Sequence, residues 1–340
     1  MCPGGRRAHT PSPLYSGERG PEASTTRGTW ANLSPDRNEF HMAAHTPHPP
    51  PEPGDGDPSS AATRGAPRAC PPSKADIGLV AIDLDGTLLN DSKRVSRRTA
   101  GAVAFLPGRG VKVVIASARP PRSVRHIYAA LKLDTWTINY NGAMIFDPPT
   151  GTVVYHKPLE CEVVWEVIDR ARGLYPDCLV SCEVLDKWYT DRNEQAYTTE
   201  TGRLFRPNLV APLEQFCNQP ITKLLLLGPR DMIGTLEPQL RAEFPDVAVV
   251  RSDPELIQVM HRKASKGRAL KKVAAHYGLT MDRVMAIGDA ANDVPMLEAA
   301  GVAVAMDNAH PSVKRVADWV APSNNDHGVH AALARYGLCE

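Results

Sequence analysis

Short apolar runs alternate with amphipathic segments in two separate parts of the chain. The apolar runs predict strands over 77–82, 111–116, 136–139, 284–287 and 302–305. The amphipathic segments predict helices over 96–106, 120–131, 265–277 and 295–300. Strands that alternate with helices of this length favour an α/β fold built on a doubly wound parallel sheet.

The pattern changes between residues 145 and 260. Strands are predicted there over 153–156, 179–184, 188–190, 223–227 and 247–251, with helices over 162–172 and 233–244. This mixture predicts an α+β domain inserted into the α/β domain. Neither flanking half, 76–144 or 261–340, has enough strands for a stable core alone, so we expect both halves to share one sheet. An insertion at the strand ends is placed to cover a site there.

Residues 1–75 differ from the rest of the chain. They hold 14 of the 31 prolines and few apolar residues, without a period of 2 or 3.6. Such a segment cannot bury enough surface to offset its ordering entropy, so we expect a disordered, proline-rich tail. A docking tail for a proline-recognising partner is one alternative. Translation that starts downstream, for instance at Met42, is another.

Composition narrows the class of protein. The net charge of +1 gives no electrostatic reason to expect a nucleic acid or a membrane surface as partner. The seven cysteines are scattered without a Cys-x-x-Cys motif, which predicts neither a disulfide framework nor a zinc site. No apolar run approaches the roughly 20 residues of a membrane helix. We therefore expect a cytoplasmic protein; its oligomeric state stays open.

The segment Asp83-Leu-Asp85-Gly86-Thr follows the first predicted strand directly. An ordinary turn is one interpretation, because Asp and Gly are common turn residues. A calcium loop of the EF-hand type does not fit, because its glycine is the sixth residue and here the fourth. Carboxylates beside a buried strand are costly unless a cation holds them, and open α/β sheets carry their chemistry at this strand end. We therefore interpret Asp83 and Asp85 as reactive groups.

Two further candidates stand at element ends. Ser117 follows the second predicted strand, where it could cap the next helix or bind a phosphate oxygen together with backbone N–H groups. Lys266 stands at the start of a predicted helix, where a cation is disfavoured by roughly 0.3–1 kcal/mol. A solvated surface lysine is one interpretation; carboxylates and a phosphate opposite the lysine would explain its position better.

The segment Gly288-Asp289-Ala-Ala-Asn292-Asp293 directly follows the predicted strand 284–287. Asp293 could cap the next helix, whereas Asp289 stands at the strand end itself. If this strand neighbours strand 77–82, several carboxylates converge, and two such charges 4 Å apart repel by about 4 kcal/mol. Such a cluster is stable around a cation, and all-oxygen ligands favour Mg²⁺. Mg²⁺ with a carboxylate nucleophile, a hydroxyl and a lysine is the equipment for phosphoryl transfer through an aspartyl-phosphate.

These features, in this order, resemble the four motifs of the haloacid dehalogenase superfamily of phosphatases. The similarity covers 77 to about 335 and is most specific to the Cof-type hydrolases. It implies a Rossmann-like core and a large α/β cap inserted between the second and third motifs. Further stretches that look Cof-like are Asn141-Gly142-Ala143, Lys263-Ala-Ser-Lys266, Asn308-Ala309 and Asn325-Asp-His-Gly328-Val329.

The resemblance implies a role for each matching residue. Asp83 would attack phosphorus, and Asp85 would protonate the leaving alkoxide and then act as general base toward water. Mg²⁺ would be held by Asp83, Asp289 and the backbone carbonyl of Asp85, with Asp293 completing the metal site by orienting Lys266 and metal-bound water. Catalysis would thus rest on Asp83, Asp85, Ser117 and Lys266. Phosphate and substrate would be bound by Gly86, Ser117, Ala118, Arg119, Asn141, Gly142, Lys266 and Asn292.

The sequence departs from the family pattern at two places. The second motif reads Ser117-Ala118-Arg119 where Thr-Gly-Arg is commoner, which keeps the hydroxyl and alters the loop. His327 stands where the tail often carries an acid, and we have no physical account of that. In the cap, Glu183, Asp186, Trp188 and Tyr189 are candidates for substrate contact, although such aromatic residues more often serve packing.

The resemblance implies a Mg²⁺-dependent hydrolase of small phosphomonoesters as the function. Sugar phosphates or phosphorylated cofactors, such as flavin mononucleotide and pyridoxal phosphate, would be the substrates. A phosphomutase or phosphotransferase with the same Asp83 chemistry is the alternative. A non-catalytic protein that kept the fold would be marked by lost motif residues, and the expected carboxylates are all present.

Overall fold

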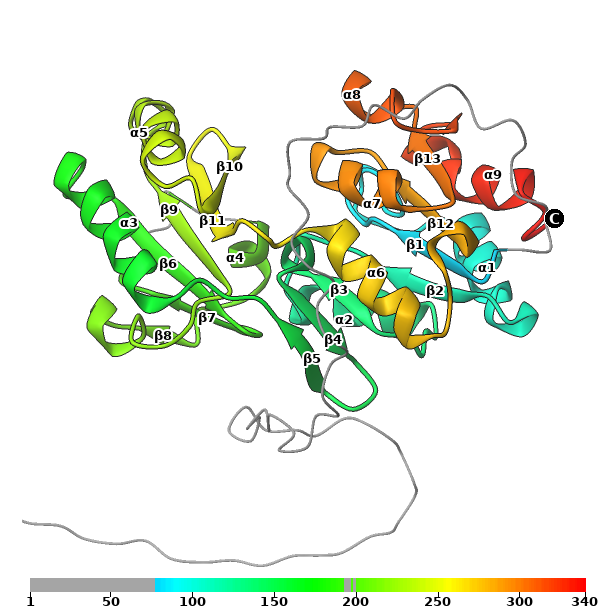
Figure 1. The fold of residues 1–340 in the computed structure, drawn as a ribbon, viewed down its shortest axis with the longest axis horizontal. Helices are drawn as coiled ribbons and strands as arrows, with labels where there is room; N and C mark the ends of the chain where they lie inside the picture. Colours follow the sequence, from blue (N-terminus) through cyan, green and yellow to red (C-terminus); the bar gives the residue numbers. More distant parts are fainter. Residues whose placement is uncertain (1–76, 193–196, 198–199) are drawn as a thin grey trace, which may run out of the picture. The chain divides into compact units, whose positions relative to one another are not determined.

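The computed structural model describes residues 77–192, 197 and 200–340 (Figure 1). The proline-rich segment 1–75 lies outside these residues. The described residues form one unit of the chain that comprises a core and an inserted cap. In the described part of the chain, every helix is too short or too polar to cross a membrane.

The core is built on a five-stranded parallel sheet. Its strands are β1 (Leu79–Ile82), β2 (Lys112–Ile115), β12 (Val284–Gly288), β13 (Val302–Met306) and β14 (Trp319–Ala321), in the order β14-β13-β12-β1-β2. The first strand of the N-terminal half pairs with β12 of the C-terminal half, with Leu79 opposite Val284 and Ile82 opposite Ile287. The two halves therefore share one sheet, and the predicted doubly wound α/β fold is confirmed.

Helices cover both faces of this sheet, because alternate strand residues point to opposite faces. Val80 and Ile82 pack with α1 (Arg97–Phe105), α2 (Pro121–Ala130) and α9 (Gly328–Arg335). Leu79 and Ala81 pack with α6 (Lys266–His276), α7 (Val294–Ala299) and α8 (Pro311–Lys314) on the other face (Figure 1). Ser96 is the N-cap of α1, since its side chain accepts a hydrogen bond from the Thr99 N–H. Burial on both faces explains why the strands read as continuous apolar runs.

A three-stranded antiparallel sheet follows the core sheet in the chain. It consists of β3 (Thr137–Asn139), β4 (Met144–Asp147) and β5 (Thr152–His156). Its first strand adjoins the core through a parallel bridge between Ala116 and Ile138. The sequence predicts the strand over 153–156 as part of the inserted domain; in the structure it pairs with β4 of this small sheet. The small sheet thus spans the predicted domain boundary at 145.

The cap contains a six-stranded sheet in the order β10-β11-β9-β6-β7-β8. Its strands are β6 (Leu179–Val184), β7 (Lys187–Thr190), β8 (Leu209–Val210), β9 (Lys223–Leu227), β10 (Val247–Asp253) and β11 (Leu256–His261). Two long helices, α3 (Cys161–Leu174) and α5 (Arg230–Glu243), pack on one face with residues such as Leu224 and Leu226. The short helix α4 (Glu200–Leu204) lies between β7 and β8 in the chain.

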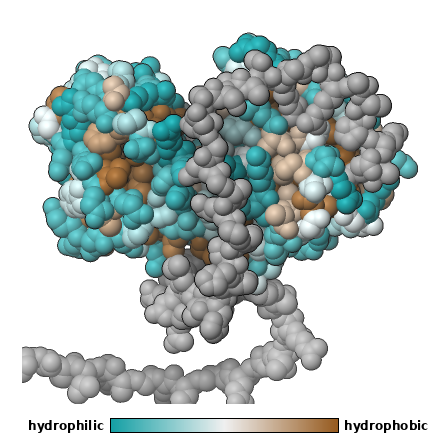
Figure 2. All heavy atoms as spheres, viewed as in Figure 1, coloured by the Kyte–Doolittle hydropathy of each residue, from teal (hydrophilic) through white to brown (hydrophobic). Residues whose placement is uncertain are grey.

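The surface is mostly hydrophilic on the face that Figure 2 shows, with small hydrophobic patches between polar residues. The largest exposed apolar side chains among the described residues are Leu204, Phe105 and Val210. They stand on three different elements, α4, α1 and β8, and single exposed apolar side chains are common in folded proteins.

Candidate active site

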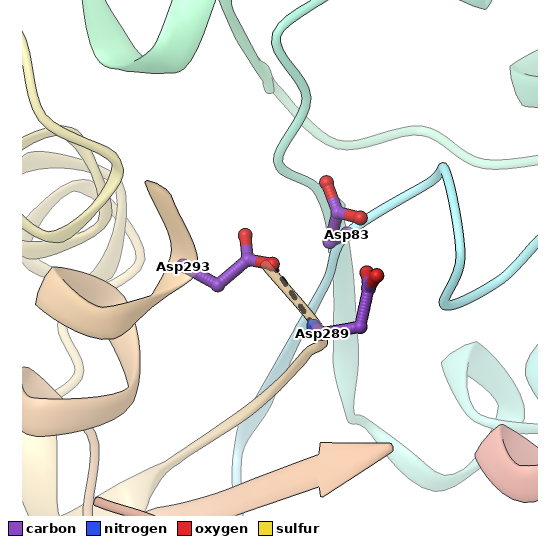
Figure 3. A group of neighbouring side chains, drawn as sticks. All are labelled: Asp83, Asp289 and Asp293. Atoms are coloured by element: carbon purple, nitrogen blue, oxygen red, sulfur yellow. Dashed lines mark hydrogen bonds between the residues drawn. The ribbon is translucent and has the colours of Figure 1, made fainter. Parts of the chain in front are cut away.

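The carboxyl ends of β1 and β12 bring two segments together that are 206 residues apart in the chain. The two strands are parallel neighbours, and the Asp83 N–H continues their ladder by donating to the Ile287 carbonyl at 3.0 Å. One carboxylate oxygen each from Asp83, Asp289 and Asp293 lies within 4.8 Å of the others (Figure 3). The structure therefore places three of the four predicted acidic residues in one cluster.

Lys266 is the cation of this cluster. Its side chain is fully buried, and its ammonium donates to Asp83 Oδ1 at 2.5 Å and to Asp293 Oδ1 at 2.6 Å. Burial alone would lower the pKa of Lys266, but the carboxylates of Asp293 and Asp83 raise it above its ordinary value. The lysine is thus an ammonium held between two carboxylates, and the surface interpretation is wrong.

The charge of the cluster is unbalanced when its members are ionised. Burial raises the pKa of Asp83 well above its ordinary value, and the nearby Asp293 carboxylate raises it further, whereas Lys266 lowers it in part. Burial also raises the pKa of Asp289. Three carboxylates face one ammonium, and all donor atoms are oxygens, which is the donor set of a hard divalent cation such as Mg²⁺. These residues therefore fit the predicted metal.

Asp293 is oriented by the loop before it. Its Oδ2 accepts hydrogen bonds from the backbone N–H groups of Asp289 and Ala290, both at 3.0 Å (Figure 3 shows the first). Although Asp293 stands at the N-cap position of α7, its side chain makes no capping hydrogen bond to that helix. The capping interpretation therefore does not explain this side chain, whose two oxygens bind the loop and Lys266.

The Asp289 side chain lies against the Gly86-Thr87 segment of the first motif. The Thr87 hydroxyl donates to Asp289 Oδ1 at 2.7 Å. Gly86 has a φ of +80°, and a Cβ at this position would lie 2.3 Å from Asp289 Oδ2. Only glycine fits here for both reasons. Asn308 donates to the Gly86 carbonyl at 2.8 Å and fixes the same turn.

Asp85 lies outside the three-carboxylate cluster. The Arg119 guanidinium donates to both of its carboxylate oxygens, at 2.6 and 2.5 Å, and Lys93 donates to Oδ1 at 2.8 Å. Burial raises the pKa of Asp85, but the hydrogen bonds from Arg119 and Lys93 outweigh that effect and lower it. The side chain is thus an ionised carboxylate clamped by two cations.

Ser117 is buried in the loop between β2 and α2. Its hydroxyl accepts a hydrogen bond from the Arg119 N–H at 3.1 Å, two residues ahead. The N-cap position of α2 is taken by Pro120, which provides no side-chain bond, so Ser117 does not cap this helix. Ala118 and Arg119 are partly exposed and line a cavity.

The remaining predicted residues join the loops of the site. Asn292 donates from Nδ2 to Asn141 Oδ1 at 2.8 Å, and the Asn141 N–H donates to the Ser117 carbonyl at 3.1 Å. A Cβ on Gly142 would lie 2.2 Å from the Ser265 carbonyl, directly before Lys266. The loop that contains Asn141 and Gly142 therefore connects the second motif at Ser117 with the third motif at Lys266 through backbone contacts.

A cavity of about 360 Å³ opens beside Asp85 and Arg119. Its other wall comes from the cap and includes Glu183, Lys223 and Leu225. Glu183 is thus placed at the cavity, as the sequence suggested. Asp186 instead accepts a hydrogen bond from the Arg122 N–H at 2.8 Å, and Tyr189 packs on Phe216 with ring centroids 5.8 Å apart.

Sequence reasoning missed three polar groups of this region. Thr87 belongs to the recognised Asp-x-Asp-Gly-Thr segment, so its position was a usable signal. Lys93 and Lys223 gave no such signal in the sequence. Lys93 stands in a loop, and Lys223 begins an apolar strand. Only the folded chain brings them to Asp85 and to the cavity.

Comparisons with known proteins find relatives of this chain by sequence. The sequence model of the haloacid dehalogenase-like hydrolases matches residues 80–333. The phosphatase YwpJ of Bacillus subtilis is 31% identical over 280 residues, which cover 74% of this chain and 96% of YwpJ. The 5-amino-6-(5-phospho-D-ribitylamino)uracil phosphatase YitU of the same organism is 30% identical, with coverage of 76% and 97%.

A solved structure shows the same fold. The crystal structure of a haloacid dehalogenase-like hydrolase from Bacteroides thetaiotaomicron superposes with a TM-score of 0.69 at 26% identity, and covers 76% of this chain and 99% of its own. The match runs through the core and the cap. The predicted resemblance is confirmed, and the chain belongs to the family of haloacid dehalogenase-like hydrolases.

Proposed function

We propose that this hydrolase is a Mg²⁺-dependent phosphatase of small phosphomonoesters that works through an aspartyl-phosphate. One observation carries the proposal: the buried Lys266 ammonium bridges Asp83 and Asp293 inside a three-carboxylate cluster at the sheet edge. A nucleophile held beside a fixed ammonium and a metal site is the arrangement that phosphoryl transfer needs.

Asp83 is the proposed nucleophile. One of its oxygens bonds to phosphorus while the bond from phosphorus to the ester oxygen breaks, and the leaving alkoxide takes a proton from Asp85. Water then attacks the phosphoryl group, gives its proton to Asp85, and releases phosphate and free Asp83. The ionised state of Asp85 beside Arg119 and Lys93 suits the base role directly. Its acid role requires that Asp85 first takes up a proton.

The other predicted residues would hold the phosphate. Ser117, Lys266 and Asn292, with the backbone of Gly86, Ala118 and Arg119, would bind the phosphoryl group in front of Asp83, and Asn141 and Gly142 would keep the loops in register. Asp83, Asp289 and the Asp85 carbonyl would ligate Mg²⁺, with Asp293 fixing Lys266. Bound there, the ion would neutralise charge on the phosphate oxygens.

The cavity and the relatives support the proposed substrate class. A cavity of about 360 Å³ accommodates an ester of sugar-phosphate or cofactor size, such as flavin mononucleotide or pyridoxal phosphate. YitU, named for a phosphorylated ribitylaminouracil, makes this compound a further candidate. A cytoplasmic location remains part of the proposal.

The test is phosphate release by the full chain, with and without Mg²⁺, against sugar phosphates, nucleotides, the two cofactors and the ribitylaminouracil phosphate. We expect Mg²⁺-dependent release of inorganic phosphate from at least one ester and the free alcohol as co-product. The product mass separates this result from a phosphotransferase, which would pass the phosphoryl group to a sugar. No release from any ester would contradict the proposal.

A further inference from the structure

The cap sheet has two different faces, because successive residues of a strand point to opposite sides of the sheet. Leu224 and Leu226 of β9 pack under the helices α3 and α5. Lys223, Leu225 and Leu227 stand at the alternate positions and line the cavity, with Leu256 of β11 beside them. The second face of the sheet therefore presents leucines and one ammonium, with polar Glu183 of β6 and Gln258 of β11 at paired positions on the same face.

Lys223 is buried, and no carboxylate among the described residues is bonded to its ammonium. Its residue is 6% exposed. Among the residues that the structure describes, its ammonium has no hydrogen-bonded or ion-paired partner and lies 5.2 Å from the centre of the Tyr140 ring. Buried charges in proteins are paired as a rule, so an unpaired ammonium at a cavity is open to an incoming acceptor.

The carboxylate of Glu183 does not fill this role, because among the described residues no hydrogen bond or ion pair joins it to Lys223. Glu183 is the strand partner of Lys223 in the β6–β9 pairing. Its Oε1 accepts from Arg122 at 2.6 Å and its Oε2 from the Tyr140 hydroxyl at 3.1 Å. Glu183 stabilises the Lys223 ammonium only from a distance and so raises its pKa in part. Burial has the larger effect and lowers the pKa of Lys223 to about 8.

We infer that Lys223 is a specificity-determining residue that binds an electron-rich oxygen on the alcohol part of the substrate. This oxygen is a carboxylate or a conjugated carbonyl, and the neighbouring carbon skeleton packs on Leu225, Leu227 and Leu256. The inference rests on the proposed phosphatase function, since Lys223 shares its cavity with Asp85 and Arg119 of the core. It narrows the substrate to phosphomonoesters that carry such an acceptor.

Binding of matched esters tests this inference without turnover. The first pair is 4-phosphoerythronate and erythritol 4-phosphate, which differ by the carboxylate. The second is 5-amino-6-(5-phospho-D-ribitylamino)uracil and ribitol 5-phosphate, which differ by the ring with its carbonyl oxygens. Calorimetric Kd values would be measured with Mg²⁺ on the full chain carrying Asp83→Asn, alone and combined with Lys223→Met. Lys187→Met is the matched control, a lysine of the same sheet that does not line the cavity.

We expect the acceptor-bearing member of at least one pair to bind about 10- to 100-fold more tightly, the range of a hydrogen bond to a charged group. Lys223→Met should abolish this ratio and Lys187→Met should keep it. A structural role of Lys223 would instead weaken both members equally and preserve the ratio, which would overturn the inference. Equal binding of both members of each pair, or no binding of any ester, would also overturn it.

The failure of the proposed function has a different signature. A chain with intact Asp83 that binds the preferred ester and releases no phosphate would contradict the phosphatase and leave the role of Lys223 supported. The identity of the pair that responds distinguishes a carboxylate from a ring carbonyl.

Discussion

Among the described residues, the core buries Lys266 and the cap buries Lys223, and the two ammonium groups have different surroundings. Lys266 donates to two carboxylates, which raise its pKa above the ordinary value. Lys223 has a distant carboxylate and an aromatic ring, and burial lowers its pKa to about 8. The first lysine uses two of its three N–H donors on carboxylates within the fold, whereas the second makes no such bond to the described residues. Burial alone therefore does not show how much hydrogen-bonding capacity a lysine keeps for a ligand; its partners do.

Among the changes that test this comparison, removal of the divalent cation from the core should have the largest effect. We expect EDTA to abolish phosphate release and to lower the melting temperature, because the carboxylates of Asp83, Asp289 and Asp293 then face one ammonium alone. Calorimetric melting with and without Mg²⁺ checks the stability part. An unchanged melting temperature together with unchanged activity would show that the cluster holds no metal.

Lys266→Met should destabilise the protein strongly. Loss of the ammonium leaves Asp83 and Asp293 buried without it, and breaking one partner of such a network costs about 3–5 kcal/mol. Urea unfolding at pH 7 measures the change in the free energy of unfolding. Lys271→Met, an exposed position of the same helix, is the control and should stay near the wild-type value. A loss below about 1 kcal/mol for Lys266→Met would contradict the account of the core lysine.

Lys223→Met should behave in the opposite way. The ammonium has no ion pair with any described residue to lose, and methionine fills similar space, so we expect stability at pH 7 to stay unchanged or to rise by about 1–2 kcal/mol. The sign follows from linkage: a lysine whose folded-state pKa is lowered opposes folding below that pKa, and this cost fades as pH rises toward the unfolded value. A loss of 3 kcal/mol would make Lys223 a structural residue.

The pH dependence of ligand affinity gives the smallest and most specific effect. The groups facing Lys223 are Glu183 of β6, Arg122 of α2 and Tyr140 of the short helix η2 (Tyr140–Gly142). We expect affinity for the acceptor-bearing ester to fall as pH rises through about 8, because the ammonium loses its proton. Titration calorimetry from pH 6.5 to about 9.5 would show this fall in the Asp83→Asn protein. If affinity did not change with pH, and the Asp83→Asn protein behaved like the Asp83→Asn/Lys223→Met double variant, the predicted role of the Lys223 ammonium would be contradicted.

Much of the core could be predicted from the sequence. Apolar runs in the sequence predicted β1, β2, β12 and β13. The rule that strand ends share one edge of a parallel sheet predicted that Asp83 and Asp289 meet if their strands are neighbours, and β1 and β12 are. The cap strand β11 was not predicted, because polar Gln258 interrupts its apolar run. Periodicity also says nothing about pairing, so it could not assign β5 to the small sheet with β3 and β4.

The contacts across the cavity could not be predicted for a similar reason. Arg119 reaches Asp85 over 34 residues of chain, and Lys223 reaches the Tyr140 ring over a longer distance still. Each side chain has an ordinary local environment in the sequence: one precedes a helix and the other begins a strand. Their chemistry arises from which loops meet, and that depends on the tertiary packing of segments with no local signal.

The rate of phosphate release by the Asp83→Asn variant tests the central claim most directly. It would be compared with the wild-type chain on the best ester under saturating Mg²⁺, with Asp134→Asn at an exposed position as the control and with unfolding curves recorded for all three proteins. An amide cannot attack phosphorus, so we expect at least a roughly thousandfold loss in the first variant and none in the control. Release within tenfold of wild type by a folded Asp83→Asn protein would contradict the assignment of the nucleophile.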